Sequence, residues 1–291
     1  IMEEESWRPK EKTTEQKIWK AAAAIIRSLR PLLLYLILPA LVASLGMMIT
    51  GRQDNTQRFV HQSGRFYKTL GIVLTFVILE RSARKRGSSI AKETTLKWEK
   101  PDIGKLFLLF GLGVGVSLFL SAAFTFLPPS IGQGYATASQ AAFSGTDLGL
   151  AIVSALVLAP VLEEVIFRGY MLNRLFDGFE QKGALLVSSL IFALCHISPL
   201  WILYAFGMGI LLACVAVWED NILYSIMLHA GFNFLSVPTL FINQSPEASE
   251  FIFGNPWIIS AYGVIGLCLA LYLWKMYRRN LGNIKSGYGV F

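Results

Sequence analysis

The stretch LVLAPVLEEVIFRGYML, residues 156–172, decides the fold of this chain. It is apolar almost throughout, which is typical of a segment inside a lipid bilayer. Yet it contains two adjacent carboxylates, Glu163 and Glu164, followed by Arg168. An ionisable group at the centre of a membrane span costs about 2.5–3.5 kcal/mol on insertion scales. Three of them in one span therefore predict partners, a water-filled cavity, or both.

The composition of the whole chain is that of an integral membrane protein. Of its 291 residues, 54% are hydrophobic and 15% are charged, whereas soluble domains have about 25% charged residues. The apolar residues stand in long blocks rather than at helix or strand spacing, and such blocks predict membrane-spanning helices. We therefore expect an all-α polytopic integral membrane protein.

Eight apolar segments are predicted to span the bilayer. They are, approximately, residues 31–50, 66–81, 105–127, 149–171, 182–197, 200–218, 222–242 and 256–274. The segment 66–81 is short for a span. We expect three parts: a polar leader at 1–30 with an amphipathic stretch on the membrane surface, one transmembrane domain at 31–274 with its core at about 147–242, and a basic tail at 275–291.

The distribution of charge predicts the orientation. The net charge is +7, and the basic residues gather in the leader, in the loop 81–100 and in the tail. The loops 128–148 and 243–256 contain no Lys or Arg, whereas the loop 52–68 contains some and conflicts mildly with the pattern. By the positive-inside rule, both termini are expected in the cytoplasm. The expected location is a prokaryotic plasma membrane. Basic flanks of this kind do not indicate a nucleic-acid partner.

The glycine-rich stretch GLGVGV, residues 111–116, is predicted to serve helix packing. Gly111 and Gly115 are four residues apart, so they form a small-residue face on which another membrane helix can approach closely. A nucleotide-binding loop would need a strand before it and a helix after it, and this stretch lies inside an apolar block.

The two glutamates are expected to differ. Glu164 and Arg168 share a helix face in the favourable order, which predicts a buried ion pair that fixes helix packing or supports a site. Glu163 points about 100° away, so Arg168 cannot easily serve both acids. An unpaired carboxylate beside a second negative charge should have its pKa raised towards neutrality, which suits a general base.

Histidines supply the second group of candidates. The chain has three; His61 is expected in a polar loop and is given no role, whereas His196 and His229 lie in apolar spans. Asn233 follows His229 by four residues and shares its face. Together with Glu163, these groups could activate a water and stabilise an oxyanion, or two histidines and a glutamate could bind zinc. Neither HExxH nor G-x-S-x-G is present.

Three motifs in this order resemble those of the type II CAAX prenyl endopeptidases, and more broadly the CPBP or Abi family of CAAX proteases and bacteriocin-processing enzymes. They are EExxxR at 163–168, FxxxH at 192–196 and HxxxN at 229–233. The resemblance implies an eight-helix membrane protein with intramembrane endopeptidase activity. Its substrate would be a hydrophobic or lipidated peptide or protein, cleaved near its C-terminus.

The resemblance also implies roles for the residues. Glu163 would activate water together with His196, and His229 and Asn233 would form the oxyanion hole. Glu164 and Arg168 would orient and support these groups. A divalent metal such as zinc and a metal-free glutamate mechanism are both compatible with it. Two other functions stay open: a non-catalytic bacteriocin-immunity or scaffold protein of the same family, and a proton-coupled transporter.

Overall fold

The computed structural model describes residues 13–50, 57–97, 100–128, 148–196, 198–242 and 245–282. The described part is helical and contains no strand. In chain order its elements are α1 (Thr14–Thr50), α2 (Gln57–Lys85), α3 (Ile90–Glu93), α4 (Ile103–Thr125), α6 (Leu148–Val153), η2 (Ser154–Leu158), α7 (Ala159–Glu164), η3 (Val165–Met171), α8 (Leu172–Leu175), α9 (Gln181–Leu194), α10 (Pro199–Glu219), α11 (Ile222–Asn233), α12 (Ser236–Ile242), α13 (Pro246–Phe253) and α14 (Pro256–Gly282). The predicted all-α polytopic membrane protein is thereby confirmed.

The number of spans differs from the eight predicted. Among the described residues, six helical segments are long and apolar enough to cross a membrane: Thr14–Ile49, Ile103–Thr125, Gly149–Leu175, Pro199–Glu219, Ile222–Thr239 and Pro256–Leu281. The predicted span 182–197 corresponds to α9, which has only 14 residues and is therefore about 21 Å long. The predicted span 66–81 is part of α2, and α2 is not among the helices that are long and apolar enough to cross a membrane.

Several predicted loops and flanks also differ from the helices that the structure shows. The amphipathic stretch of the leader and the first predicted span are joined in the single helix α1, which contains Pro31 and Pro39. Proline is tolerated inside membrane helices because neighbouring groups satisfy the freed backbone. His61, expected in a loop, lies in α2. The predicted loop 128–148 lies largely outside the described residues, as do the first residues of the leader and the end of the tail.

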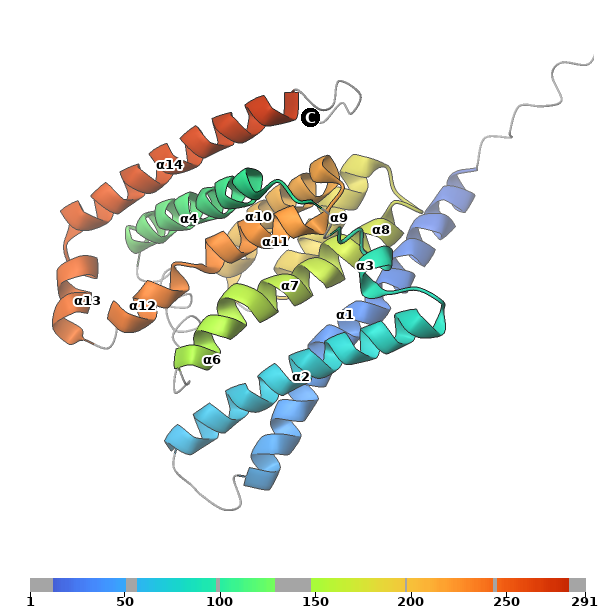
Figure 1. Ribbon diagram of the computed structural model, residues 1–291, viewed down its shortest axis with the longest axis horizontal. Coiled ribbons are helices and arrows are strands. Elements are labelled where there is room, and N and C mark those ends of the chain that lie inside the picture. The colour runs from blue at the N-terminus through green and yellow to red at the C-terminus, as the bar shows by residue number, and fades with distance from the viewer. Residues whose placement is uncertain are drawn as a thin grey trace, which may run out of the picture.

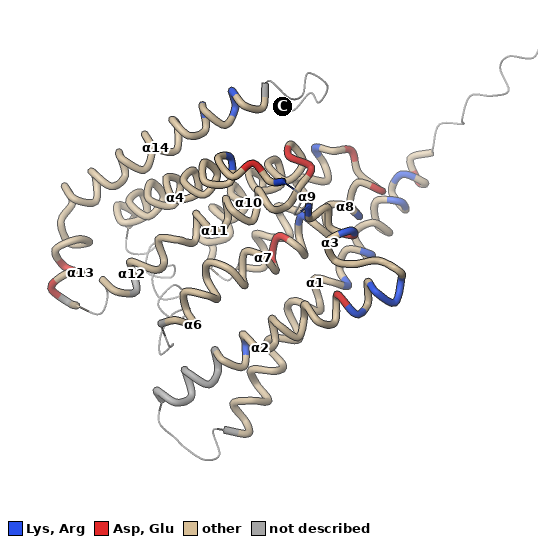
Figure 2. The backbone as a smooth tube through the Cα atoms, in the orientation of Figure 1, with Lys and Arg blue, Asp and Glu red and all other residues tan. Residues whose placement is uncertain are grey.

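The helices form a stack in which the segment 148–175 is central (Figure 1). α14 packs on α4, α4 packs on α11, and α11 packs on η2 and α7. On its other side this segment contacts α1, which pairs with α2, while α9 and α10 pack on each other and on η3. Figure 2 shows most charged residues at one end of the stack, near α3, α8 and the start of α4.

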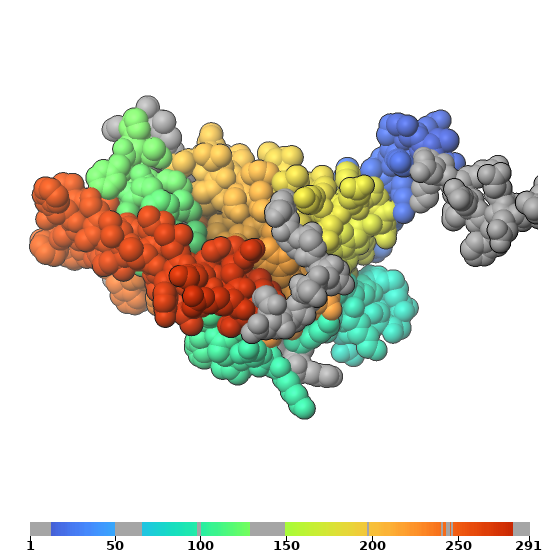
Figure 3. Space-filling model, turned by 90° about the horizontal axis from the view of Figure 1, so that it is seen from above, coloured from blue at the N-terminus to red at the C-terminus, as the bar shows by residue number. Residues whose placement is uncertain are grey.

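The outer helices present apolar side chains outward. Seen from above, α14 forms a ridge along the molecule (Figure 3), and Trp257 on it is 83% exposed. On α1, Ile37 is 58% and Leu41 is 50% exposed. A soluble monomer rarely exposes large contiguous apolar patches, so these surfaces fit contact with lipid.

Glycines of α4 allow its backbone to touch two other helices. A Cβ atom at Gly115 would lie 2.9 Å from the backbone nitrogen of Ala270, and one at Gly111 would lie 3.0 Å from Leu273 Cδ1, both on α14. The predicted Gly111–Gly115 packing face is therefore confirmed. Gly113 serves a second face, since a Cβ there would collide with the carbonyl oxygen of Leu228 on α11.

Candidate active site

The segment that carries the glutamates is a continuous helix with two π-helical turns. In η2 the N–H of Ala159 bonds to the carbonyl of Ser154, and after η3 the N–H of Leu172 bonds to that of Phe167. These are i→i−5 bonds, which widen the helix and occur frequently at functional sites. The short α-helix α7, which ends at Glu164, lies between the two wide turns.

Glu164 is the centre of a fully buried hydrogen-bond network. Its Oε1 accepts from Arg168 Nη1 at 2.9 Å and lies 2.9 Å from His229 Nδ1. Arg168 also donates from Nη2 to the carbonyl of Gly209 at 2.9 Å, and its guanidinium lies 4.5 Å from the ring centre of Phe192. The predicted Glu164–Arg168 pair is confirmed, and it connects α7, η3, α9, α10 and α11.

Glu163 has partners that the sequence did not predict. Its Oε1 accepts a hydrogen bond of 2.9 Å from the hydroxyl of Tyr35, on α1. Its Oε2 lies 3.7 Å from His229 Nε2. The expectation of an unpaired carboxylate is therefore wrong, because a residue of the first helix reaches it. The side chain of Glu163 is 16% exposed, whereas that of Glu164 is fully buried.

The bonding of His229 assigns its hydrogens. An ionised carboxylate only accepts hydrogen bonds, so Nδ1 carries the hydrogen that points at Glu164. Nε2 is then the nitrogen that exchanges a proton, and it faces Glu163. The network thus orients the imidazole edge that is needed for proton transfer.

His196 borders this cluster through an aromatic ring. It follows the C-terminus of α9, and its Nδ1 lies 3.1 Å from the carbonyl of Phe192. Because a carbonyl only accepts, Nδ1 carries the hydrogen and Nε2 keeps a lone pair. The ring of Phe192 is 5.1 Å from the imidazole of His196 and 6.0 Å from that of His229, measured between centroids. Phe192 therefore contacts both histidines.

Asn233 supports the first wide turn. Its Nδ2 donates to the carbonyl of Ala155 at 3.1 Å. In an α-helix that carbonyl would accept from Ala159 N–H, which here bonds to Ser154 instead. In the π register its donor would be residue 160, which is Pro160 and has no N–H. Asn233 supplies the missing donor, and the second hydrogen of its amide is available for other acceptors.

The structure thus brings four of the six predicted site residues into one cluster: Glu163, Glu164, Arg168 and His229. Of the other two, His196 lies beside the ring of Phe192, which also contacts His229, and Asn233 bonds to the backbone of Ala155 in η2. Tyr35 was missed, and its only sequence signal was a hydroxyl within an otherwise apolar block.

The arrangement can transfer protons, but it is not a metal-ligand set. Within the described residues, no group of three or more His, Cys, Asp or Glu side chains is placed to hold a metal ion. Glu164 Oε1 and His229 Nδ1 are hydrogen-bonded to each other. As arranged, these residues do not fit the zinc site that the sequence allowed.

Comparison with known proteins finds similarity to one family over the part of the chain that contains the cluster. Residues 145–235 match the family model described as type II CAAX prenyl endopeptidase Rce1-like. The chain is also similar to the membrane-embedded CAAX protease MroQ of Staphylococcus aureus strain USA300, with 34% identity over 98 residues. That match covers 32% of this chain and 39% of the relative. No solved structure is significantly similar. Residues 145–235, which contain all six predicted site residues, are therefore the part of the chain that is similar to Rce1-like CAAX proteases.

Proposed function

We propose that this protein is an intramembrane endopeptidase that hydrolyses a peptide bond near the C-terminus of a hydrophobic or lipidated substrate. One observation carries the proposal. Glu163, partly accessible, faces the exchangeable Nε2 of His229 at 3.7 Å, and the fully buried Glu164–Arg168 pair holds that imidazole in place. A positioned carboxylate and imidazole are the groups that peptide hydrolysis needs.

In the proposed mechanism Glu163 is the general base. The gap of 3.7 Å between Glu163 Oε2 and His229 Nε2 is too long for a direct hydrogen bond, so Oε2 can accept a hydrogen bond from the attacking water. Glu163 takes a proton as water attacks the substrate carbonyl, and it returns the proton to the leaving amine. His196 contributes the lone pair of Nε2 to hold the attacking water.

The oxyanion of the tetrahedral intermediate would be stabilised by His229 and Asn233. A proton on His229 Nε2 makes it a donor, and it also makes the formal charge of the cluster zero, because two carboxylates then face one guanidinium and one imidazolium. Asn233 would donate its second amide hydrogen. Glu164 and Arg168 act through His229 and are positioning residues.

The substrate class follows from the setting and from the relative. The candidate site lies among membrane helices, so an apolar or lipid-modified peptide can reach it from the bilayer. The name of the relative from Staphylococcus aureus identifies that protein as a CAAX protease, which supports a substrate with a processed C-terminal tail here. The cell membrane of a prokaryote, with both termini in the cytoplasm, is the proposed location.

A cleavage assay in detergent micelles tests the proposal. Lipidated and unmodified peptides with hydrophobic C-termini are offered to the wild type and to Glu163→Gln, which keeps the shape of the side chain but removes the base. The expected loss in cleavage rate is about 10²–10⁴-fold. Glu180→Gln is the matched control, because Glu180 is exposed and its side chain makes no capping hydrogen bond. Full activity of Glu163→Gln would refute the assignment.

A chelator experiment distinguishes a metal-free glutamate mechanism from a zinc-dependent mechanism. The purified wild type is treated with 1,10-phenanthroline, and its zinc content is measured before and after. The proposed glutamate mechanism predicts unchanged cleavage and no stoichiometric zinc. Stoichiometric zinc that is lost together with activity, and both restored by added zinc, would replace it with a metal mechanism.

A second candidate function is a non-catalytic immunity or scaffold protein. It is favoured by the complete burial of the Glu164–Arg168 pair and its bond to the backbone of Gly209, which can serve structure alone. In that case, Glu163→Gln and His229→Ala would leave biological activity unchanged, and no peptide would be cleaved.

A further inference from the structure

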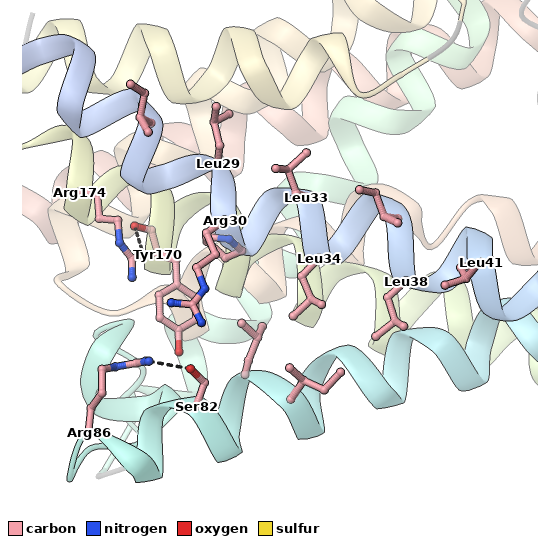
Figure 4. Close-up of a pocket in the computed structure, with 15 residues that line it drawn as sticks. Leu29, Arg30, Leu33, Leu34, Leu38, Leu41, Ser82, Arg86, Tyr170 and Arg174 are labelled. Atoms are coloured by element: carbon pink, nitrogen blue, oxygen red, sulfur yellow. Dashed lines mark hydrogen bonds between the residues drawn. The ribbon is translucent and has the colours of Figure 1, made fainter.

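A groove runs along α1 beside α2 (Figure 4). Its volume is about 650 Å³, which is within the range of about 300–1,000 Å³ of ligand sites. Most of its wall is aliphatic, with Leu34, Leu38 and Leu41 of α1 opposite Ile78 of α2. Leu41 is 50% and Ile78 is 42% exposed, so the groove is accessible from the surface that would contact lipid.

One end of the groove is cationic. Arg30 of α1, Arg86 after α2 and Arg174 of α8 gather there around Tyr170, as Figure 4 shows. Arg30 and Arg86 both lie close enough to Arg174 to repel its charge. Like charges brought together by the fold raise the free energy of the folded state unless an anion compensates them.

The protein itself compensates only part of this charge. Arg86 donates to Glu93 at 2.7 Å, and this bond lowers the pKa of Glu93, which keeps that carboxylate ionised. Arg174 donates to the backbone carbonyl of Tyr170 at 3.0 Å, which removes no charge. Arg30 makes no hydrogen bond or ion pair with the described residues. Three guanidinium groups therefore face one carboxylate.

We infer that this groove binds one molecule of an anionic phospholipid, with its phosphate at Arg30, Arg86 and Arg174 and an acyl chain along Leu34, Leu38 and Leu41. Guanidinium groups bind phosphate oxygens bidentately. Basic pockets between membrane helices at the cytoplasmic side are suited to anionic headgroups.

Position and charge favour a phospholipid over a lipidated peptide as the occupant. The arginines lie at the end of the stack where Lys and Arg gather (Figure 2), which is the end expected at the cytoplasmic headgroup layer. A phospholipid has its phosphate next to its chains, which matches a cationic end directly joined to an apolar groove. A lipidated peptide has its terminal carboxylate some residues away from its lipid.

The bound lipid would also act on the candidate active site, because the groove and the site share two elements. Tyr35, which bonds to Glu163, is adjacent to Leu34 in α1. Tyr170 follows Arg168 by two residues in η3. A lipid in the groove would hold α1 against η3 and thereby keep Tyr35 on Glu163.

The test measures lipid retention rather than cleavage, so its outcome is independent of the proposed protease activity. The full chain is placed in nanodiscs of phosphatidylcholine with increasing phosphatidylglycerol, released, and analysed by native mass spectrometry. The wild type is expected to retain one phosphatidylglycerol in preference to phosphatidylcholine. Arg30→Gln should reduce that preference about fivefold, and Arg30→Lys should keep most of it.

Two further variants define the site. Arg84→Gln is the matched control, since Arg84 is on α2 near Arg86, is 74% exposed and pairs with Glu80 outside the groove; its preference should equal that of the wild type. Leu38→Trp fills the groove and should reduce retention of both lipids while the arginines stay in place.

Four results would overturn the inference. Equal retention of the two lipids by the wild type would remove the headgroup selectivity. Equal losses in Arg30→Gln and Arg84→Gln would indicate diffuse surface charge. Displacement of phosphatidylglycerol by glycerol phosphate, which has no chains, would remove the role of the groove. Displacement by a prenylated peptide, but not by neutral lipid, would assign the groove to the substrate.

Discussion

Arg168 and Arg174 stand six residues apart on one helical segment, yet the regions around them differ completely. Arg168 is fully buried, and it is matched by Glu164 and by the carbonyl of Gly209. Arg174 lies at the end of the α1–α2 groove and has two further arginines as neighbours. Full burial makes an unmatched charge too costly to keep. At the groove, access from outside permits more positive than negative charge. The excess positive charge can bind an anionic ligand.

Loss of the matched arginine should have the largest effect. Arg168→Met removes one partner of a buried pair and leaves Glu164 uncompensated, which should lower the free energy of unfolding by about 3–5 kcal/mol. Unfolding of the detergent-solubilised protein in increasing denaturant measures it. Arg84→Met removes a partner from an exposed pair and should cost about 1 kcal/mol or less. Equal losses of unfolding free energy in the two variants would mean that burial does not distinguish the region of Arg168 from the accessible region.

A smaller effect is expected where the backbone of α11 meets that of α4. A Cβ at Gly231 would collide with the carbonyl of Phe110, so Gly231→Ala must push α11, which carries His229, away from α4. Overpacking of this kind costs about 1–3 kcal/mol, and cleavage should fall with stability. Gly207→Ala is the control, because a Cβ there meets nothing within 4 Å. If both variants were equally stable, the close approach of α4 would not position His229.

The local part of the site could be predicted from the sequence. The spacing of Glu164 and Arg168 predicted their pair, because residues four apart share a helix face, and the same rule predicted the Gly111–Gly115 packing face. The three motifs predicted which helices carry the polar groups. In each case the information lies within a few residues of the chain.

The long-range part could not be predicted. Tyr35 is 128 residues from Glu163, and no periodicity shows which face of α1 meets α7. The π-helical turn at η2 depends on the side chain of Asn233, which belongs to another helix. The count of eight spans is not confirmed, because an apolar run such as α9 can end after 14 residues.

The smallest of these expected effects tests whether α1, which borders the accessible groove, also contributes to the buried site around Arg168. Tyr35→Phe removes a single hydroxyl that donates to Glu163 at 2.9 Å and keeps the ring that packs against Phe167. A hydrogen bond to a charged group contributes about 1.5 kcal/mol or more to stability, so its loss should lower the free energy of unfolding by about that amount and the cleavage rate by up to about tenfold. Tyr272→Phe, at a 62% exposed position of α14, should have no effect. A Tyr35→Phe rate equal to that of the wild type would show that Glu163 is held by the core alone, and that α1 only covers the site.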